Sequence, residues 1–280
     1  MAEIRHYQGY GALSDLPCWE LIIGNSKAVV SSYGAHVFCY QVGSEPVLWL
    51  SETAVWQNGK AIRGGIPICW PWFGACPTEL NSDNSTKPNH GLARTQFWTV
   101  TEQVVADSEV QISFELKKLQ LPWALELVDV KYLVELTEDS LTVTLSSEQL
   151  IAQQAALHSY FKVENSAESE VSPLPYEYYD KTTDSMEIAD SETCRFPAEI
   201  DRVYANTGEL LKLFGPSKPL IIRQNGHDAS IVWNPGFTKA SQATDIAPNS
   251  WQQFVCVESA SLSLLPSRLC LSQQIKNPFA

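Results

Sequence analysis

The 280-residue sequence lacks the common motifs of nucleotide, metal and esterase sites. It contains no GxGxxG, no GxxxxGK[ST], no HExxH and no GxSxG, and none of its seven cysteines forms a CxxC pair. Dinucleotide-dependent enzymes, P-loop proteins, zinc proteases and α/β-hydrolases each depend on one of these patterns. We therefore expect neither a metal nor an organic cofactor.

Basic residues and long hydrophobic runs are also scarce. Nineteen Lys and Arg stand against 32 Asp and Glu, which gives a net charge of −13. Such a field repels nucleic acid and anionic lipid, so we expect neither as a partner, and only a few local cations could hold a bound anion. No run approaches the length of a membrane span, and the first residues, MAEIRHYQGYGAL, do not resemble a signal peptide. The scattered, odd-numbered cysteines indicate a reduced, cytoplasmic protein.

Helical periodicity is nearly absent, and alternation with a period of two replaces it. Apolar residues alternate with polar ones at 110–114, 129–136 and 140–146, as in half-buried strands. Short helical turns are expected only near 51–56 and 240–246. Shorter runs rich in β-branched and aromatic residues predict further strands at 20–23, 28–33, 36–42, 47–50, 230–233 and 254–258. The pattern predicts one all-β, antiparallel sandwich or barrel domain over residues 1–280.

One segment combines backbone breakers with aromatic residues. IRGGIPICWPWFG, residues 62–74, places Arg63 before two glycines and is followed by a polar stretch at 75–89 that we expect to border a site. The rings of Trp70, Trp72 and Phe73 could pack against a ligand or against the core. Arg63 could bind a ligand oxygen through its planar guanidinium, or pair with a local carboxylate.

Two ionisable residues in apolar runs are candidates for acid–base chemistry. His158 lies in QAALHSYFKV, where alternation would place it on the same face as Tyr160. It is either a packed core histidine or a general acid that titrates near neutrality. Glu258 follows FVCV, and it is either a solvated residue at a strand terminus or a carboxylate in a pocket over the sheet.

The remaining candidates have plain structural alternatives. Asp201 could form a surface ion pair with its neighbour Arg202, and Arg94 could pair with one of the many carboxylates. His90 precedes a glycine and is expected in a turn. We treat the other histidines as structural: His6, His36 and His227.

Taken in order, five short motifs with six candidate residues resemble the aldose 1-epimerase (galactose mutarotase-like) superfamily, most closely its glucose-6-phosphate 1-epimerase branch, the D-hexose-6-phosphate mutarotases. The match extends from about residue 20 to about residue 270, and the CWPWFG after IRGG is typical of that branch. The motifs are Arg63 in IRGGIPICWPWFG, His90 and Arg94 in HGLAR, His158 in LHSYF, Asp201 in DRVY and Glu258 in VCVES.

The resemblance implies a galactose mutarotase-like β-supersandwich and an isomerase that interconverts the α and β anomers of glucose 6-phosphate. It makes His158 the general acid and Glu258 the general base. His90 and Asp201 would hold sugar hydroxyls, Arg63 would line the same cleft, and Arg94 would be a second cation for the phosphate. A third cation is not placed by the resemblance, and Lys87 is one candidate.

Three alternatives stay open at this point. A mutarotase of unphosphorylated aldoses would keep Glu258 and His158 without needing Arg94. A carbohydrate-binding or regulatory protein of the same fold would have no use for an acid and a base, and an unrelated all-β binding protein would have to match all five motifs by chance. We expect a monomer, whose partner is a small sugar phosphate.

Overall fold

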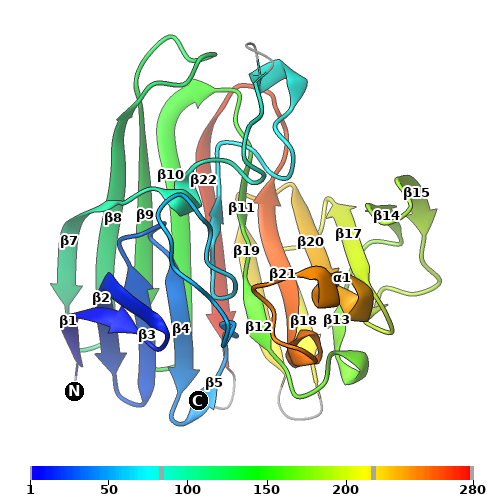
Figure 1. Cartoon of the computed structure of the whole chain (residues 1–280), viewed down its shortest axis with the longest axis horizontal. Helices are drawn as coiled ribbons and strands as arrows, with labels where there is room; N and C mark the ends of the chain where they lie inside the picture. The colour runs from blue at the N-terminus through cyan, green and yellow to red at the C-terminus, as the bar shows by residue number, and fades with distance from the viewer. Residues whose placement is uncertain (1, 82–84, 216–218, 278–280) are drawn as a thin grey trace.

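Strands of three antiparallel sheets form most of the structure, a computed structural model that describes residues 2–81, 85–215 and 219–277 (Figure 1). The five-stranded sheet has the order β1 (Ala2–Tyr10), β2 (Leu13–Ile23), β3 (Ser26–Ser31), β4 (Val37–Val42) and β5 (Glu45–Pro46). The nine-stranded sheet has the order β16 (Cys194–Arg195), β13 (Glu170–Ser172), β18 (Leu210–Phe214), β19 (Leu220–Asn225), β22 (Ser267–Lys276), β10 (Ser140–Ile151), β9 (Val128–Leu136), β8 (Val110–Leu119) and β7 (Thr99–Val105). The eight-stranded sheet has the order β15 (Ser185–Ile188), β14 (Glu177–Asp180), β17 (Ile200–Ala205), β20 (Ala229–Asn234), β21 (Phe254–Ser261), β11 (Ala155–Leu157) and β6 (Ile68–Cys69), with β12 (Tyr160–Lys162) paired to β21.

The nine-stranded sheet forms a long layer that the other two sheets cover side by side. The five-stranded sheet packs over it through β2 on β8 and β3 on β9, and the eight-stranded sheet through β21 and β11 on β22. Figure 1 shows these two halves, with the hairpin of β14 and β15 projecting at one end. The expectation of an all-β, antiparallel fold is confirmed.

Alternation along each strand explains how the layers pack. In β10 the side chains of Leu141, Val143 and Leu145 are fully buried in the main apolar cluster, while the threonines between them are only half-buried. Residues from all three sheets contribute to this cluster. Burying such aliphatic side chains contributes about 1.5–3 kcal/mol each, so the main apolar cluster is the main source of stability.

A group of neutral polar side chains, the serine–glutamine network, bridges the eight- and nine-stranded sheets. Ser159 Oγ donates to Gln273 Oε1 at 2.5 Å, and Gln273 Nε2 donates to Ser259 Oγ at 2.9 Å. Ser259 and Ser230 both donate to Gln224 Oε1, at 2.8 and 2.9 Å. These buried groups therefore satisfy one another without any charge.

Helices are few and short in the described residues. The α-helix α1 spans Gly236–Gln242, somewhat earlier than the turn expected at 240–246. Near 51–56 the chain forms a turn, in which Ala54 N–H donates to Ser51 O. Residues 47–50, predicted as a strand, make only isolated bridges from Leu48 and Leu50. Single 3-10 turns occupy Thr78–Leu80, Ala93–Thr95, Ser166–Glu168 and Ser250–Gln253.

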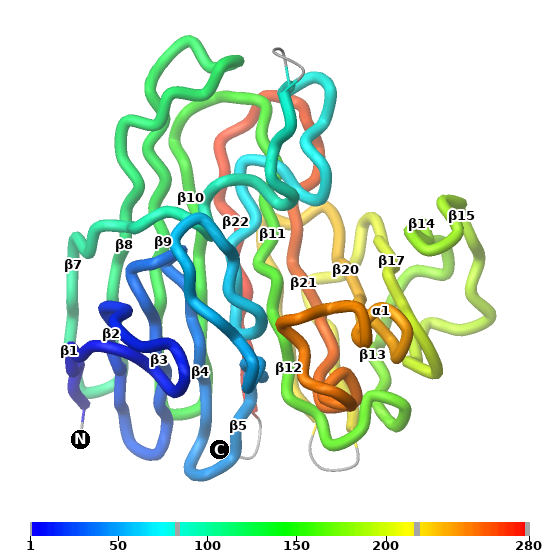
Figure 2. The backbone as a smooth tube through the Cα atoms, viewed as in Figure 1, coloured from blue at the N-terminus to red at the C-terminus, as the bar shows by residue number. Residues whose placement is uncertain are grey.

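The chain after β5 crosses from the five-stranded to the eight-stranded sheet (Figure 2). Trp49 N–H donates to Tyr160 O at 2.9 Å, and Ser51 Oγ donates to Asp245 O at 2.7 Å. This crossing segment leads directly into IRGGIPICWPWFG. Parts of the chain about a hundred and two hundred residues apart in sequence thus meet on the outer face of the eight-stranded sheet.

Candidate functional site

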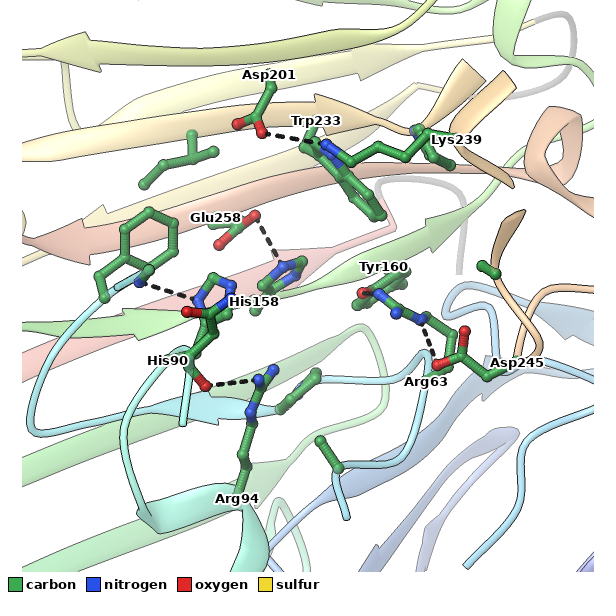
Figure 3. Close-up of a pocket in the computed structure, with 18 of the residues that line it drawn as sticks. Arg63, His90, Arg94, His158, Tyr160, Asp201, Trp233, Lys239, Asp245 and Glu258 are labelled. Atoms are coloured by element: carbon green, nitrogen blue, oxygen red, sulfur yellow. Dashed lines mark hydrogen bonds and ion pairs between the residues drawn. The ribbon is translucent and has the colours of Figure 1, made fainter. Parts of the chain in front are cut away.

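A cavity of about 500 Å³ opens on the outer face of the eight-stranded sheet (Figure 3). All six residues singled out in the sequence line it: Arg63, His90, Arg94, His158, Asp201 and Glu258. They come from loops beside β6, from the break between β11 and β12, and from β17 and β21. The sheet thus supplies a rigid floor, and loops supply the walls.

Glu258 and His158 form the buried centre of the cavity. Glu258 lies in the middle of β21, only 1% exposed, so the alternative of a solvated strand terminus is wrong: the strand continues through Ser261. His158 occupies the gap between β11 and β12, and its Nε2 lies 3.3 Å from Glu258 Oε1. Its ring stacks on Tyr160 at 4.9 Å, as the alternation predicted.

Burial shifts both groups of this pair toward neutrality. It raises the pKa of Glu258 well above its ordinary range, against the opposing effect of Lys181. It lowers the pKa of His158 well below 6.5, and the nearby His90 lowers it further. Glu258 Oε2 is buried and accepts no hydrogen bond from the described residues. A buried carboxyl oxygen without a donor is costly, and such atoms gather at functional sites.

His90 is fixed as a neutral hydrogen-bond donor. It lies in the expected turn, with a left-handed backbone (φ 65°). Gly74 N–H donates to its Nδ1 at 3.3 Å, with Cys69 Sγ 3.4 Å from the same atom. Burial lowers the pKa of His90 to about 3. An Nδ1 that accepts leaves the ring hydrogen on Nε2, which can donate to a ligand.

Arg63 is held on two sides by residues from distant segments. Its Nε donates to Asp245 Oδ2 and its Nη1 to Tyr160 Oη, both at 3.0 Å. The alternative of a carboxylate partner is therefore met, although that partner, Asp245, lies 182 residues away in the sequence. These two bonds leave Nη2 without a partner among the described residues, and the guanidinium lines the cavity (Figure 3).

The glycines after Arg63 let the chain approach its neighbours closely. Gly64 and Gly65 both have positive φ, and a Cβ on Gly65 would overlap the carbonyl oxygen of Val37. His36, treated as structural in the sequence, supports this turn: its Nε2 lies 2.7 Å from Gly64 O. The segment therefore presents Arg63 from a backbone that has no room for larger residues.

The guanidinium of Arg94 is held by fewer hydrogen bonds than that of Arg63. Its Nη2 donates to the main-chain oxygen of Asn89 at 2.8 Å, and within the described part of the chain no carboxylate pairs with it. The alternative of a carboxylate partner is thus not met. Arg63 and Arg94 lie along one side of the cavity, with Asp201 across from them (Figure 3).

Asp201 forms ion pairs, although not with Arg202. Lys181 Nζ lies 3.4 Å from Oδ1 of Asp201, and Lys239 Nζ lies 4.0 Å from Oδ2, whereas Arg202 pairs with Asp180 at 3.6 Å. Neighbouring strand residues point to opposite faces, which separates Asp201 from Arg202. Burial raises the pKa of Asp201, while both lysines oppose the rise.

Sequence reasoning missed several lining residues, and no local pattern would have revealed them. Lys87, the suggested third cation, does not line the cavity, whereas Lys181 and Lys239 do. Of the three aromatic candidates, Trp70 and Trp72 are buried in the core and only Phe73 reaches the cavity. Gly74, Ala75 and Asn89 bring the two ends of the polar stretch to the rim, and its residues 82–84 lie outside the described residues. Trp233 and Asp245 also line the cavity, as does Tyr160, which the sequence placed only on the same face as His158.

No cluster of His, Cys, Asp and Glu suited to a metal ion occurs among residues 2–81, 85–215 and 219–277. The same part of the chain contains no helix long and apolar enough to span a membrane.

Comparison with known proteins identifies the relatives of this chain. Residues 17–265 match the aldose 1-epimerase family model. The chain is 32% identical over 252 residues to an Escherichia coli protein named "Putative glucose-6-phosphate 1-epimerase", covering 87% of this chain and 84% of that one. A Salmonella typhimurium protein of the same name is 31% identical over 248 residues, or 86% and 82% of the two chains.

Solved structures agree with the sequence match. The crystal structure titled as a putative mutarotase from Salmonella typhimurium superposes with a TM-score of 0.85 at 27% identity, over 98% of this chain and 96% of the other. A galactose 1-epimerase from Lactobacillus acidophilus has a TM-score of 0.73 at 14% identity, over 99% and 98% of the chains, and shares the fold. The expected galactose mutarotase-like architecture is confirmed.

Proposed function

Because the chain belongs to the aldose 1-epimerase family and is therefore an isomerase, we propose that it is a D-hexose-6-phosphate mutarotase that interconverts the anomers of glucose 6-phosphate. The names of its relatives support this substrate class. The observation that carries the proposal is the contact at 3.3 Å between Glu258 and His158 at the base of the cavity.

Mutarotation opens a cyclic hemiacetal and closes it on the other face. A base removes the proton of the anomeric hydroxyl while an acid donates a proton to the ring oxygen; after rotation about the bond beside the aldehyde, both transfers reverse. Glu258 Oε2, which has no donor among the described residues, is free to accept from the anomeric hydroxyl. His158 Nε2 is the proton donor to the ring oxygen.

The shifted pKa values favour this pair of transfers. Glu258 with a raised pKa is a stronger base, and His158 with a lowered pKa is a stronger acid. Ring opening starts from carboxylate and imidazolium and ends with both groups neutral. Burial favours that neutral end state, and it makes the preceding transfer of the proton from Glu258 to His158 the costly step. The same burial leaves the pair neutral at rest, with one proton shared between the two residues.

Two further groups suit the sugar hydroxyls. The Nε2–H of His90 is a neutral donor, and the Asp201 carboxylate is an acceptor that Lys181 holds in place. Phe73 and Trp233 supply apolar ring surface at the cavity wall, which suits the carbon–hydrogen face of a pyranose. Together these contacts would orient the anomeric centre over the acid–base pair.

The phosphate is assigned to Arg63 and Arg94. Guanidinium groups bind phosphate through two parallel hydrogen bonds, and Arg63 is already held by Asp245 and Tyr160. Against a net charge of −13, these two cations on one side of the cavity provide the local attraction that an anion needs. The lysines across the cavity are instead paired with Asp201 and Glu199.

Anomer exchange measured by NMR tests the proposal directly. Glucose 6-phosphate and free glucose are followed side by side, with the Glu258→Gln protein as the blank for spontaneous exchange. Faster exchange of the phosphorylated sugar supports the proposal. Equal acceleration of both sugars would favour a general aldose mutarotase, and binding without acceleration of either would indicate a carbohydrate-binding protein.

We also propose a cytoplasmic monomer with residues 1–280 as one domain and no nucleic-acid partner. The seven cysteines are all free, which suits a reducing compartment, and the acidic charge disfavours nucleic acid. The main apolar cluster draws side chains from all three sheets, as expected of a single folding unit.

A further inference from the structure

Tyr160 contacts the acid–base pair with its ring and the arginine with its hydroxyl. The ring stacks on His158 with centroids 4.9 Å apart and planes within 10°, while Oη accepts from Arg63 Nη1 at 3.0 Å. The side chain is 2% exposed, so it cannot easily take another orientation. Figure 3 shows Tyr160 beside Arg63, with Asp245 on the far side of the guanidinium.

The position of Tyr160 is fixed by its surroundings. Its N–H donates to Gly65 O at 2.9 Å, two residues from Arg63, and its carbonyl accepts from Trp49 N–H at 2.9 Å. The ring packs against Trp49 and Phe254, with centroids 5.8 and 5.3 Å away. The tyrosine hydroxyl is therefore a fixed point against which the guanidinium is oriented.

We infer that Tyr160 is a positioning residue that sets the preference for phosphorylated over unphosphorylated aldoses. This inference rests on the proposed function. The hydroxyl and Asp245 together hold two of the three guanidinium nitrogens, so that Nη2 is presented to the phosphate in one orientation. The ring independently keeps His158 in place. The hydroxyl thus serves anion binding, and the ring serves the chemistry.

Removing only the hydroxyl separates the two contributions. In Tyr160→Phe the ring still stacks on His158, whereas Arg63 loses a buried acceptor and one of its two anchors. Because hydrogen bonds to charged groups are among the stronger ones, the KM for glucose 6-phosphate should rise about tenfold. The kcat for glucose 6-phosphate and the kcat/KM for free glucose should both stay unchanged.

The measurement is NMR anomer exchange over a series of concentrations of both sugars, for wild type and Tyr160→Phe. Tyr132→Phe is the matched control, since Tyr132 is equally buried, lies in the core away from the cavity, and its hydroxyl has no partner among the described residues. The control should leave both sugars unaffected.

Asp245→Asn is a second variant that weakens the other anchor and keeps the tyrosine. It should also raise the KM for glucose 6-phosphate, because Arg63 then has one firm anchor. A tenfold loss of kcat on both sugars in Tyr160→Phe would overturn the inference, since the hydroxyl would then serve the chemistry. An unchanged KM would overturn it as well. Failure of the proposed function would be seen separately, as a wild-type protein with no preference for the phosphorylated sugar.

Discussion

The two faces of the eight-stranded sheet treat buried polar groups in opposite ways. On the face toward the nine-stranded sheet, Ser159 and Ser259 belong to the serine–glutamine network, in which neutral donors and acceptors satisfy one another. On the cavity face, the preceding residues His158 and Glu258 carry ionisable groups, and Glu258 Oε2 lacks a donor in the described chain. In both places, one residue step along the chain leads from the satisfied network to the unsatisfied pair.

In the proposed mechanism, this contrast separates the polar groups that stabilise the fold from the acid and the base. The inner network costs little because it contains no charge and leaves no partner missing. The outer pair is destabilising in the free protein, because burial opposes both of its charges. A destabilising buried pair of this kind is retained where function requires it. The packing of the inner face provides the stability that offsets its cost.

Neutralising the carboxylate of Glu258 on the cavity face should have the largest effect on activity and stability. Glu258→Gln should reduce the acceleration of anomer exchange by about 10²–10⁴-fold, the usual contribution of a general base. It should also raise the thermal unfolding temperature. The pKa of Glu258 is raised above 4.5 in the folded state, so its ionisation costs stability as the pH rises from 4.5 through the folded value.

The stability difference between Glu258→Gln and wild type should therefore be small near pH 4 and grow at higher pH. Thermal unfolding scans at several pH values measure it. Glu115→Gln is the control, because that carboxylate is nearly as buried but is paired with Lys117 and Lys131. A Glu258→Gln protein that is less stable than wild type at neutral pH would contradict the idea of a strained outer face.

The pH dependence of kcat/KM tests whether His158 and Glu258 have the shifted pKa values that their burial implies. The active pair holds one proton, so activity should follow a bell-shaped curve. Since the pKa of His158 is lowered, the acidic limb should lie below 6.5. The alkaline limb reports loss of the shared proton, and the raised pKa of Glu258 places it well above 4.5. Phosphate itself titrates near pH 6, so glucose 6-phosphate and free glucose must be compared.

His158→Asn should abolish the bell and most of the acceleration. Exchange rates measured across the pH range, with the spontaneous rate subtracted, provide the test. An acidic limb at or above 6.5 with both sugars would mean that His158 is solvated during catalysis, contrary to its burial.

The smallest effect is expected from the inner face. Ser159→Ala removes the donor to Gln273 Oε1, and leaving a buried acceptor unsatisfied costs about 1–3 kcal/mol of unfolding free energy. Because this side chain points away from the cavity, kcat should be unchanged. Denaturant unfolding and anomer exchange on the same preparation measure the two quantities. Loss of activity without loss of stability would show that the two faces are not independent.

Much of the fold follows from the sequence because alternation survives in long strands. Residues 110–114, 129–136 and 140–146 were each predicted as strands, and each lies within one. Residues 47–50 are also rich in strand-forming residues but cross between sheets, and composition alone cannot distinguish a strand from a buried connection. The alternative of a solvated strand terminus at Glu258 is wrong because the strand continues through Ser259 to Ser261, which are small or polar but remain largely buried.

The six motif residues reach the cavity as the resemblance implied, but their partners were not predictable. Asp245, Lys181 and Lys239 come from turns and a short helix whose local sequence shows nothing distinctive. Which lysine reaches Asp201 depends on how the hairpin of β14 and β15 folds back toward the sheet. Such contacts between distant residues are fixed only by the tertiary fold.

That hairpin has a practical consequence for redesign. It pairs with the sheet over only two residue pairs, Tyr179 with Val203 and Asp180 with Arg202, and its tip delivers Lys181 to the cavity rim. Glu258 lies on β21 and His158 between β11 and β12, both outside the hairpin. Changing the length of the turn at its tip should therefore widen or narrow the mouth of the cavity, provided that a cation is kept at position 181 to pair with Asp201.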